Sequence, residues 1–234
     1  MGSTTSIHND YDDRHVVSFV GVNVAGVIIG STIVLLATAG AGALVYLGAG
    51  GAAAGAAAIG TTLVVAIEPE IAEAAVELVE TLGKEPFFEG TTGIFDIDIP
   101  GLANSMTFAT FSGMSESGRQ EYTTKLLQAG YATDEDKRTP GMRRLLEETD
   151  LLKQKKFAQD YQATIGGEIL NPGQKRKYGG ILSLVRTSYQ YTFSCKNGVV
   201  TSQKGSMTVW TGLTNKSDIT YKVSDHNLKD WDGK

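Results

Sequence analysis

The sequence has a single cysteine, Cys195, and only three histidines among its 234 residues. One thiol cannot form an internal disulfide, and a structural zinc site needs several thiolates or imidazoles at close spacing. The disulfide-rich secreted class and the zinc-finger class are therefore excluded. Cys195 lies in a run that alternates like a strand, so we interpret it as a small, buried or half-buried side chain rather than a nucleophile.

Charge is missing from one long stretch and unevenly spread over the rest. No Asp, Glu, Lys, Arg or His occurs from Val16 to Ile67, which is built largely from Gly, Ala, Val, Leu and Ile. The first 84 residues carry eight acids against Arg14 and Lys84, a net charge of -6, whereas the remaining residues are nearly balanced. The overall net charge of -5 argues against a nucleic-acid binder, so we expect no nucleic-acid partner.

The uncharged stretch reads as a helical hairpin. Residues 17–38 would form a helix about 33 Å long, enough to cross a hydrocarbon layer of about 30 Å, and residues 43–67 would form a second one. Four glycines form two pairs at four-residue spacing: Gly26 with Gly30, and Gly51 with Gly55. Each pair leaves a patch without side chains on one helix face, which favours close helix contact or oligomerisation of the glycine-zipper kind.

Our leading hypothesis from the sequence is therefore a non-enzymatic membrane-associated protein. Its hairpin would insert in a bilayer or drive homo-oligomerisation, as a pore-forming or anchoring segment, with membrane lipids as partners. Gly2 fits the Met-Gly-x-x-x-Ser pattern of N-myristoylation, which would place the protein on the cytoplasmic face of a membrane.

Two other functions stay open at this point. The chain could be a soluble structural or self-assembling protein that buries the hairpin in its own core or in an oligomer. Alternatively, Gly48–Ala53 matches the G-x-G-x-x-A pattern of dinucleotide-binding enzymes, and Glu68 follows at the spacing of a ribose-binding acid. The chain lacks the further strand-helix-strand units that this fold needs, so the motif alone is weak.

The clearest helix runs from Pro69 to Leu82, with an apolar face and an opposite acidic face. We interpret that acidic face, which carries Glu73, Glu77 and Glu80, as a solvated surface rather than a catalytic set. Two further helices are expected from Ser115 to Gln128 and from Thr139 to about Tyr161. The charged residues of the second helix, including Arg143, Arg144, Lys153, Lys155 and Lys156, are expected on its exposed side. Residues 94–99 and 106–111 are expected to form strands, because polar and apolar residues alternate in the first and strand formers fill the second.

From Glu168 to the end, the sequence predicts an antiparallel sheet with a hairpin turn at Asn197-Gly198. The basic run Lys175, Arg176 and Lys177, together with Trp210, is our candidate contact for a lipid headgroup or another ligand. Alternatively, Trp210 and the other aromatic residues of this region pack within and between the strands.

The sequence as a whole predicts an α+β fold: an apolar helical hairpin, then amphipathic helices and a C-terminal antiparallel sheet. The expected divisions are a polar segment at 1–14, the hairpin and its amphipathic helix at 15–84, and the α+β region at 85–234. No catalytic constellation is recognisable, and we expect no cofactor. The cluster of His8, His15 and three aspartates has no regular ligand spacing, so we assign no metal site.

Overall fold

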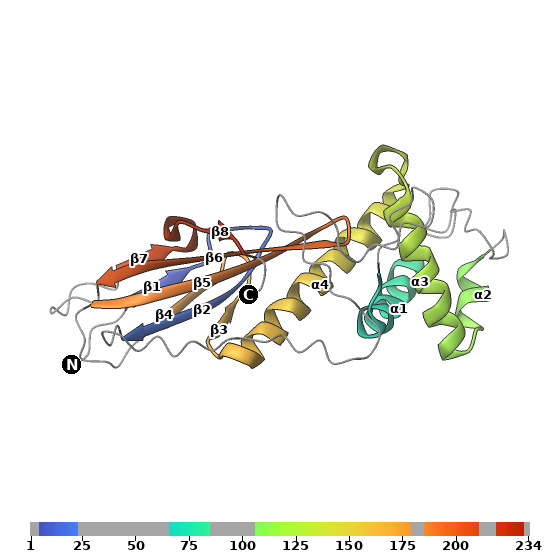
Figure 1. The fold of residues 1–234 in the computed structure, drawn as a ribbon. Coiled ribbons are helices and arrows are strands. Elements are labelled where there is room, and N and C mark those ends of the chain that lie inside the picture. Colours follow the sequence, from blue (N-terminus) through green and yellow to red (C-terminus); the bar gives the residue numbers. More distant parts are fainter. Residues whose placement is uncertain (1–4, 23–65, 85–105, 179–184, 211–218, 232–234) are drawn as a thin grey trace.

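The computed structural model describes residues 5–22, 66–84, 106–178, 185–210 and 219–231 (Figure 1). The described part is elongated, with two β-sheets at one end, a group of helices at the other, and one long helix running between them. Helices and sheets occupy separate ends rather than alternating, so the predicted α+β class is confirmed.

The larger sheet has five strands in the order β3-β2-β5-β6-β8 and is antiparallel throughout. Its strands are β2 (His15–Val22), β3 (Glu168–Leu170), β5 (Val185–Lys196), β6 (Val199–Trp210) and β8 (Lys229–Asp230). The predicted turn between β5 and β6 is confirmed: Asn197 has φ of 53° and Gly198 has φ of 76°. These residue types tolerate the left-handed region that a tight hairpin requires.

The smaller sheet joins segments that lie far apart in the sequence. It has three strands in the order β4-β1-β7: β4 (Lys175–Tyr178), β1 (Thr5–His8) and β7 (Ile219–Lys222). The central strand, β1, is antiparallel to β4 and parallel to β7. A short 3₁₀-helix, η3 (Val223–His226), follows β7.

The two sheets pack against each other, and the long helix α4 (Pro140–Ile165) covers the opposite face of the larger sheet. Val16 of β2 packs with Ile7 between the sheets, whereas the next residue, Val17, packs against α4. Successive strand residues point to opposite faces, so β2 is buried on both sides at Val16 and Val17, and the strand contains no Asp, Glu, Lys or Arg. The core between α4 and the larger sheet also contains Ala158, Tyr161, Phe193 and Trp231.

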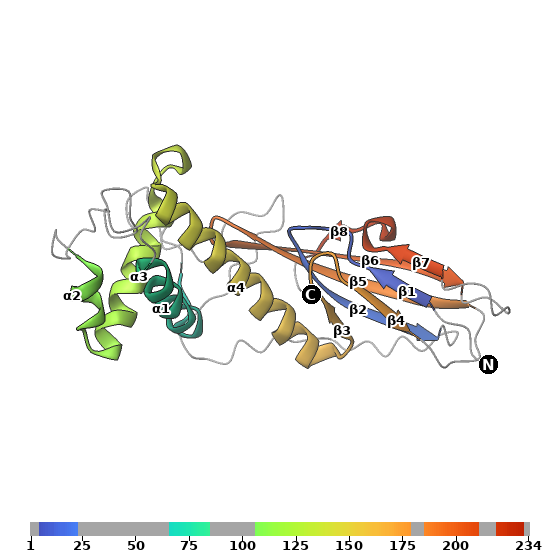
Figure 2. The same ribbon diagram turned by 180° about the vertical axis from the view of Figure 1, so that it is seen from behind.

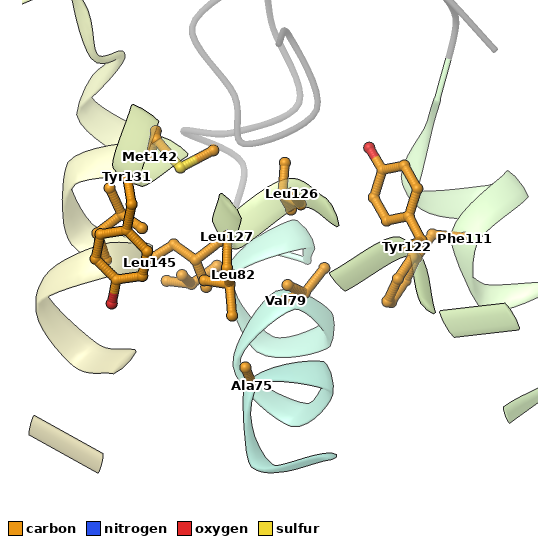
Figure 3. Packing of buried hydrophobic residues seen from close by; sticks show 11 residues of the cluster. Ala75, Val79, Leu82, Phe111, Tyr122, Leu126, Leu127, Tyr131, Met142 and Leu145 are labelled. Carbon is orange, nitrogen blue, oxygen red and sulfur yellow. The ribbon is translucent and has the colours of Figure 1, made fainter. Parts of the chain in front are cut away.

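The helical end has a core of its own. Its elements are α1 (Pro69–Gly83), α2 (Phe108–Ser112), α3 (Glu116–Ala132), the 3₁₀-helix η2 (Glu135–Lys137) and the first half of α4. Ala75, Val79 and Leu82 of α1 lie together with Leu126 and Leu127 of α3 (Figure 3). The predicted helices at 69–82, 115–128 and 139–161 are confirmed, with Ser115 and Thr139 as capping residues.

One predicted strand is wrong. Residues 106–111 do not form a strand: Phe108–Ser112 is the short helix α2, and the Thr107 hydroxyl accepts a hydrogen bond from the Thr110 amide. Phe111 is then completely buried against Tyr122 of α3, at 5.7 Å between ring centroids. This cap and this tertiary contact outweigh the strand preference of the local sequence.

The prediction of a transmembrane, pore-forming hairpin is contradicted. None of the helices in the described ranges is both long and apolar enough to cross a membrane. The first residues of the uncharged stretch lie in β2, and Ile67, at its other end, packs on the helical core. A strand buried on both faces is as free of charge as an apolar helix, and hydropathy alone does not separate the two.

Several sequence predictions concern residues outside those described. Among them are Gly26, Gly30, Gly51 and Gly55 of the proposed glycine zipper, Gly2 of the acylation pattern, the Gly48–Ala53 motif and the strand at 94–99. These stay predictions, as do the division boundaries at 14 and 84.

Candidate functional site

The three-stranded sheet carries a row of basic side chains on its outer side. In its register Lys175 of β4 and Lys222 of β7 both lie directly opposite His8 of β1. Lys177 is two residues along β4 from Lys175, so it shares that side of the sheet. Tyr178 and Tyr221 lie on the other side and pack in the core between the sheets. We call the four residues His8, Lys175, Lys177 and Lys222 the basic face.

The lysines of the basic face are exposed to solvent, although Ser6, which lies on the same side of β1, is completely buried. All three of its lysines are exposed, and His8 is half-buried. Within the described part of the chain, neither Lys175 nor Lys222 forms an ion pair. Like charges on neighbouring strands repel each other, so a face of this kind favours an anionic partner.

The predicted ligand-contact residues are divided by the structure. Lys175 and Lys177 belong to the basic face, but Arg176 lies on the opposite side of β4 and pairs with Glu168 at 3.2 Å. Trp210 is the last residue of β6, where its backbone pairs with Val185 in the other sheet. The sequence grouped Arg176 with its neighbours because a basic run does not show which side of a strand each residue takes.

One carboxylate, Asp10, borders the basic face next to Lys222. Its two oxygens accept hydrogen bonds from the Ser224 amide at 3.1 Å and the Ser224 hydroxyl at 2.6 Å. Partial burial acts to raise the pKa of Asp10, but these bonds and the Lys222 charge outweigh it, so the pKa is lowered. This carboxylate is therefore hydrogen-bonded to Ser224 within the chain.

The outer side of α1 is acidic. Glu70, Glu73 and Glu77 are exposed and fall at i, i+3 and i+7, along one row of the helix. Glu73 and Glu77 form no ion pair with any residue in the described ranges, whereas Glu80 is bonded to Arg119 at 3.4 Å. We call Glu70, Glu73 and Glu77 the acidic face of α1. The predicted exposure of the acidic face is confirmed for Glu73 and Glu77, whereas Glu80 is half-buried.

The two faces lie far apart in the folded chain. In both views α1 belongs to the helical end, and the strands β4, β1 and β7 form part of the sheet end (Figures 1 and 2). The long helix α4, which at about 1.5 Å per residue is about 39 Å long, separates the two groups. A contact between the basic face and the acidic face of the same chain is therefore sterically impossible.

A buried polar junction links the helical end to the β5–β6 hairpin. The Asp150 Oδ1 of α4 accepts hydrogen bonds from the Tyr131 hydroxyl at 2.7 Å and the Gly198 amide at 2.9 Å, with the Cys195 thiol at 3.4 Å. Arg138 donates to the Asn197 side-chain oxygen at 2.7 Å. The junction therefore fixes the hairpin turn against α3 and α4.

The junction also contains Lys153, which is only 5% exposed. Its ammonium donates to the carbonyl oxygens of Ala66 at 3.3 Å and Gly198 at 3.2 Å, and lies 5.5 Å from the centroid of the Tyr131 ring. Burial lowers the pKa of Lys153, while the charges of Asp150 and Glu68 oppose that shift. The sequence interpretation placed Lys153 on the exposed side of its helix, and this was wrong.

A signal for its burial was present in the spacing. Met142, Leu146, Thr149 and Lys153 fall at i, i+4, i+7 and i+11, which is one helix face. The charge of Lys153 masked that pattern.

The junction holds its ionisable groups in their protonated or bonded forms. Burial raises the pKa of the Cys195 thiol, and the Asp150 carboxylate raises it further. Burial and the same carboxylate raise the pKa of Tyr131. A thiol is a good nucleophile only as a thiolate, so Cys195 is held in its unreactive form, in agreement with the sequence interpretation.

Two histidines are buried: His15 at the start of β2 and His226 at the end of η3. His15 Nδ1 is hydrogen-bonded to the Gln154 side-chain amide of α4 at 2.8 Å. His226 bonds the Ser188 hydroxyl at 2.9 Å through Nε2 and the Lys222 carbonyl oxygen at 2.8 Å through Nδ1. Burial lowers the pKa of both, and the Lys155 charge lowers that of His15 further. These imidazoles join layers of the fold as neutral groups.

Comparison of the chain with protein-family models, with curated proteins and with solved structures finds no match.

Proposed function

We propose that this chain is a structural protein that assembles with copies of itself. The observation that supports this most directly is the separation of unlike charge along an elongated body: a basic face at the sheet end and the acidic face of α1 at the helical end. Opposite patches of this kind steer copies of one molecule towards each other and fix their orientation.

The buried groups are consistent with a structural rather than a catalytic role. Asp150, Lys153 and Arg138 each form a hydrogen bond with the β5–β6 hairpin and at least one more with the helical end or its connections. These bonds fix the two ends of the described part relative to each other, and an interface whose groups are already ordered loses less conformational entropy when it assembles.

The mass of the full chain in solution tests the proposal. Sedimentation velocity should give species heavier than the 24.9 kDa monomer, in proportions that rise with protein concentration. Because the Debye length falls from about 30 Å in 0.01 M salt to about 3 Å in 1 M salt, the association should weaken strongly over that range. A chain that sediments as a monomer at every concentration in low salt would refute self-assembly.

A further inference from the structure

The geometry points to one specific contact, which rests on the self-assembly proposed above: the acidic face of α1 in one copy docks on the basic face of the next copy. The occupant of the basic face is thus Glu70, Glu73 and Glu77 of a second chain. Three properties of the two faces support this contact: their opposite charges, their matching lengths and their places at opposite ends of the described part.

The charged rows match in length. Lys175 and Lys222 flank His8 across three adjacent strands, so two interstrand spacings of about 4.8 Å separate them, about 10 Å in all. Glu70 and Glu77 are seven residues apart on one helix, about 10.5 Å at 1.5 Å per residue. A helix lying across the strands therefore places one glutamate near each lysine, with Glu73 between them facing His8 or Lys177.

The contact joins unlike surfaces of two copies, because the two faces differ in charge and cannot reach each other within one chain. If a pair of copies forms one such contact, each copy keeps one unsatisfied face, and assembly continues into a ring or an open, polar filament. If a pair forms two such contacts about a twofold axis, the assembly closes as an antiparallel dimer. Sedimentation velocity distinguishes the two, because only the first gives species heavier than a dimer.

Two charge-reversed variants test this contact. The first is Lys175→Glu/Lys177→Glu/Lys222→Glu, and the second is Glu70→Lys/Glu73→Lys/Glu77→Lys. All six side chains are exposed, so the fold should persist, which circular dichroism checks. Each variant alone carries two faces of the same sign, and its apparent dissociation constant for self-association should rise at least about tenfold.

The decisive measurement is an equimolar mixture of the two variants. The first retains an acidic α1 and the second retains a basic sheet face, so they should associate with each other in sedimentation velocity although neither associates alone. The matched controls reverse exposed charges elsewhere: Lys155→Glu/Lys196→Glu/Lys229→Glu, and Glu135→Lys/Asp136→Lys/Glu147→Lys. Both controls should assemble like the wild type.

The outcomes separate this contact from self-assembly itself. If the wild type assembles and both variants assemble equally well, the contact is wrong although self-assembly stands. Loss of assembly in the lysine variant alone would mean that the basic face binds another anionic part of the chain, and it would also overturn the α1 contact. Should a triple variant fail to fold, the corresponding Lys→Gln or Glu→Gln set replaces it, and its association must weaken for the inference to hold.

Discussion

The Tyr131 hydroxyl donates a hydrogen bond to the Asp150 carboxylate at 2.7 Å, and this bond ties the end of α3 to the middle of α4. The same carboxylate oxygen accepts the Gly198 amide at the tip of the β5–β6 hairpin. Asp150 is therefore one of three side chains, with Arg138 and Lys153, that join the helical end to the β5–β6 hairpin of the sheet end.

Asp150→Ala should lower the free energy of unfolding by about 2–3 kcal/mol, because it leaves the Tyr131 hydroxyl and the Gly198 amide without their acceptor in a partly buried site. Tyr131→Phe removes only one donor and should cost about 1 kcal/mol. Urea unfolding followed by circular dichroism measures both changes.

The matched control is Asp160→Ala on the same helix. Asp160 pairs with Lys156 at 3.2 Å near the surface, and such pairs contribute at most about 1 kcal/mol. An Asp150→Ala variant no less stable than Asp160→Ala would show that the junction does not hold the two ends together.

The buried histidines predict a loss of stability in mild acid. Burial lowers the pKa of His15 and His226 in the folded protein, whereas in the unfolded chain each has a pKa of about 6.5. Below that pH the unfolded chain binds protons that the folded chain does not, so stability is complete above about pH 6.5 and falls as the pH drops. Unfolding free energies measured between about pH 7 and pH 5 should follow this course.

Replacement of one imidazole should reduce this dependence. His226→Gln should flatten the slope of stability against pH, since each histidine contributes at most about 1.4 kcal/mol per pH unit. Ser188→Ala is the control: it removes the hydrogen bond to His226 at 2.9 Å but keeps the imidazole, so stability should fall while a slope remains. An unchanged slope in His226→Gln would contradict the prediction.

Elements with strong local signals could be predicted from the sequence, and contacts between distant segments could not. The helices starting at Pro69 and Pro140 were predicted because proline at the first turn, capping residues and apolar periodicity agree within each segment. The turn between β5 and β6 could be predicted from the Asn197-Gly198 pair alone. Each of these signals is local, and tertiary structure reinforced it.

The candidate site, in contrast, arises from strand pairing over long sequence separations. His8 meets Lys175 and Lys222 only because β1 is the central strand between β4 and β7. The spacing of residues within one segment does not show which distant strands will pair, so the sequence revealed the basic run at 175–177 but not the basic face. The same limit applies to Val16 and Val17, whose opposite burial depends on two different layers.

Close packing of α3 on α4 makes Gly130 sensitive to a single added methyl group. A Cβ at this position would overlap the Met142 sulfur and lie 3.2 Å from a Leu146 methyl carbon. Alanine is favoured over glycine in a helix by about 1 kcal/mol, but overpacking of a core costs about 1–3 kcal/mol. Gly130→Ala should therefore lower the free energy of unfolding despite its better helix propensity, as urea unfolding can measure.

The double variant Gly130→Ala/Met142→Ala identifies the cause. Met142→Ala alone removes a completely buried side chain and should cost about 2–5 kcal/mol. It also clears the space that the new methyl group needs. In that background Gly130→Ala should be neutral or stabilising, so the two changes are not additive. Additive losses would mean that Gly130 is required for a reason other than its contact with Met142, and a Gly130→Ala protein as stable as the wild type would show that the helices separate at little cost.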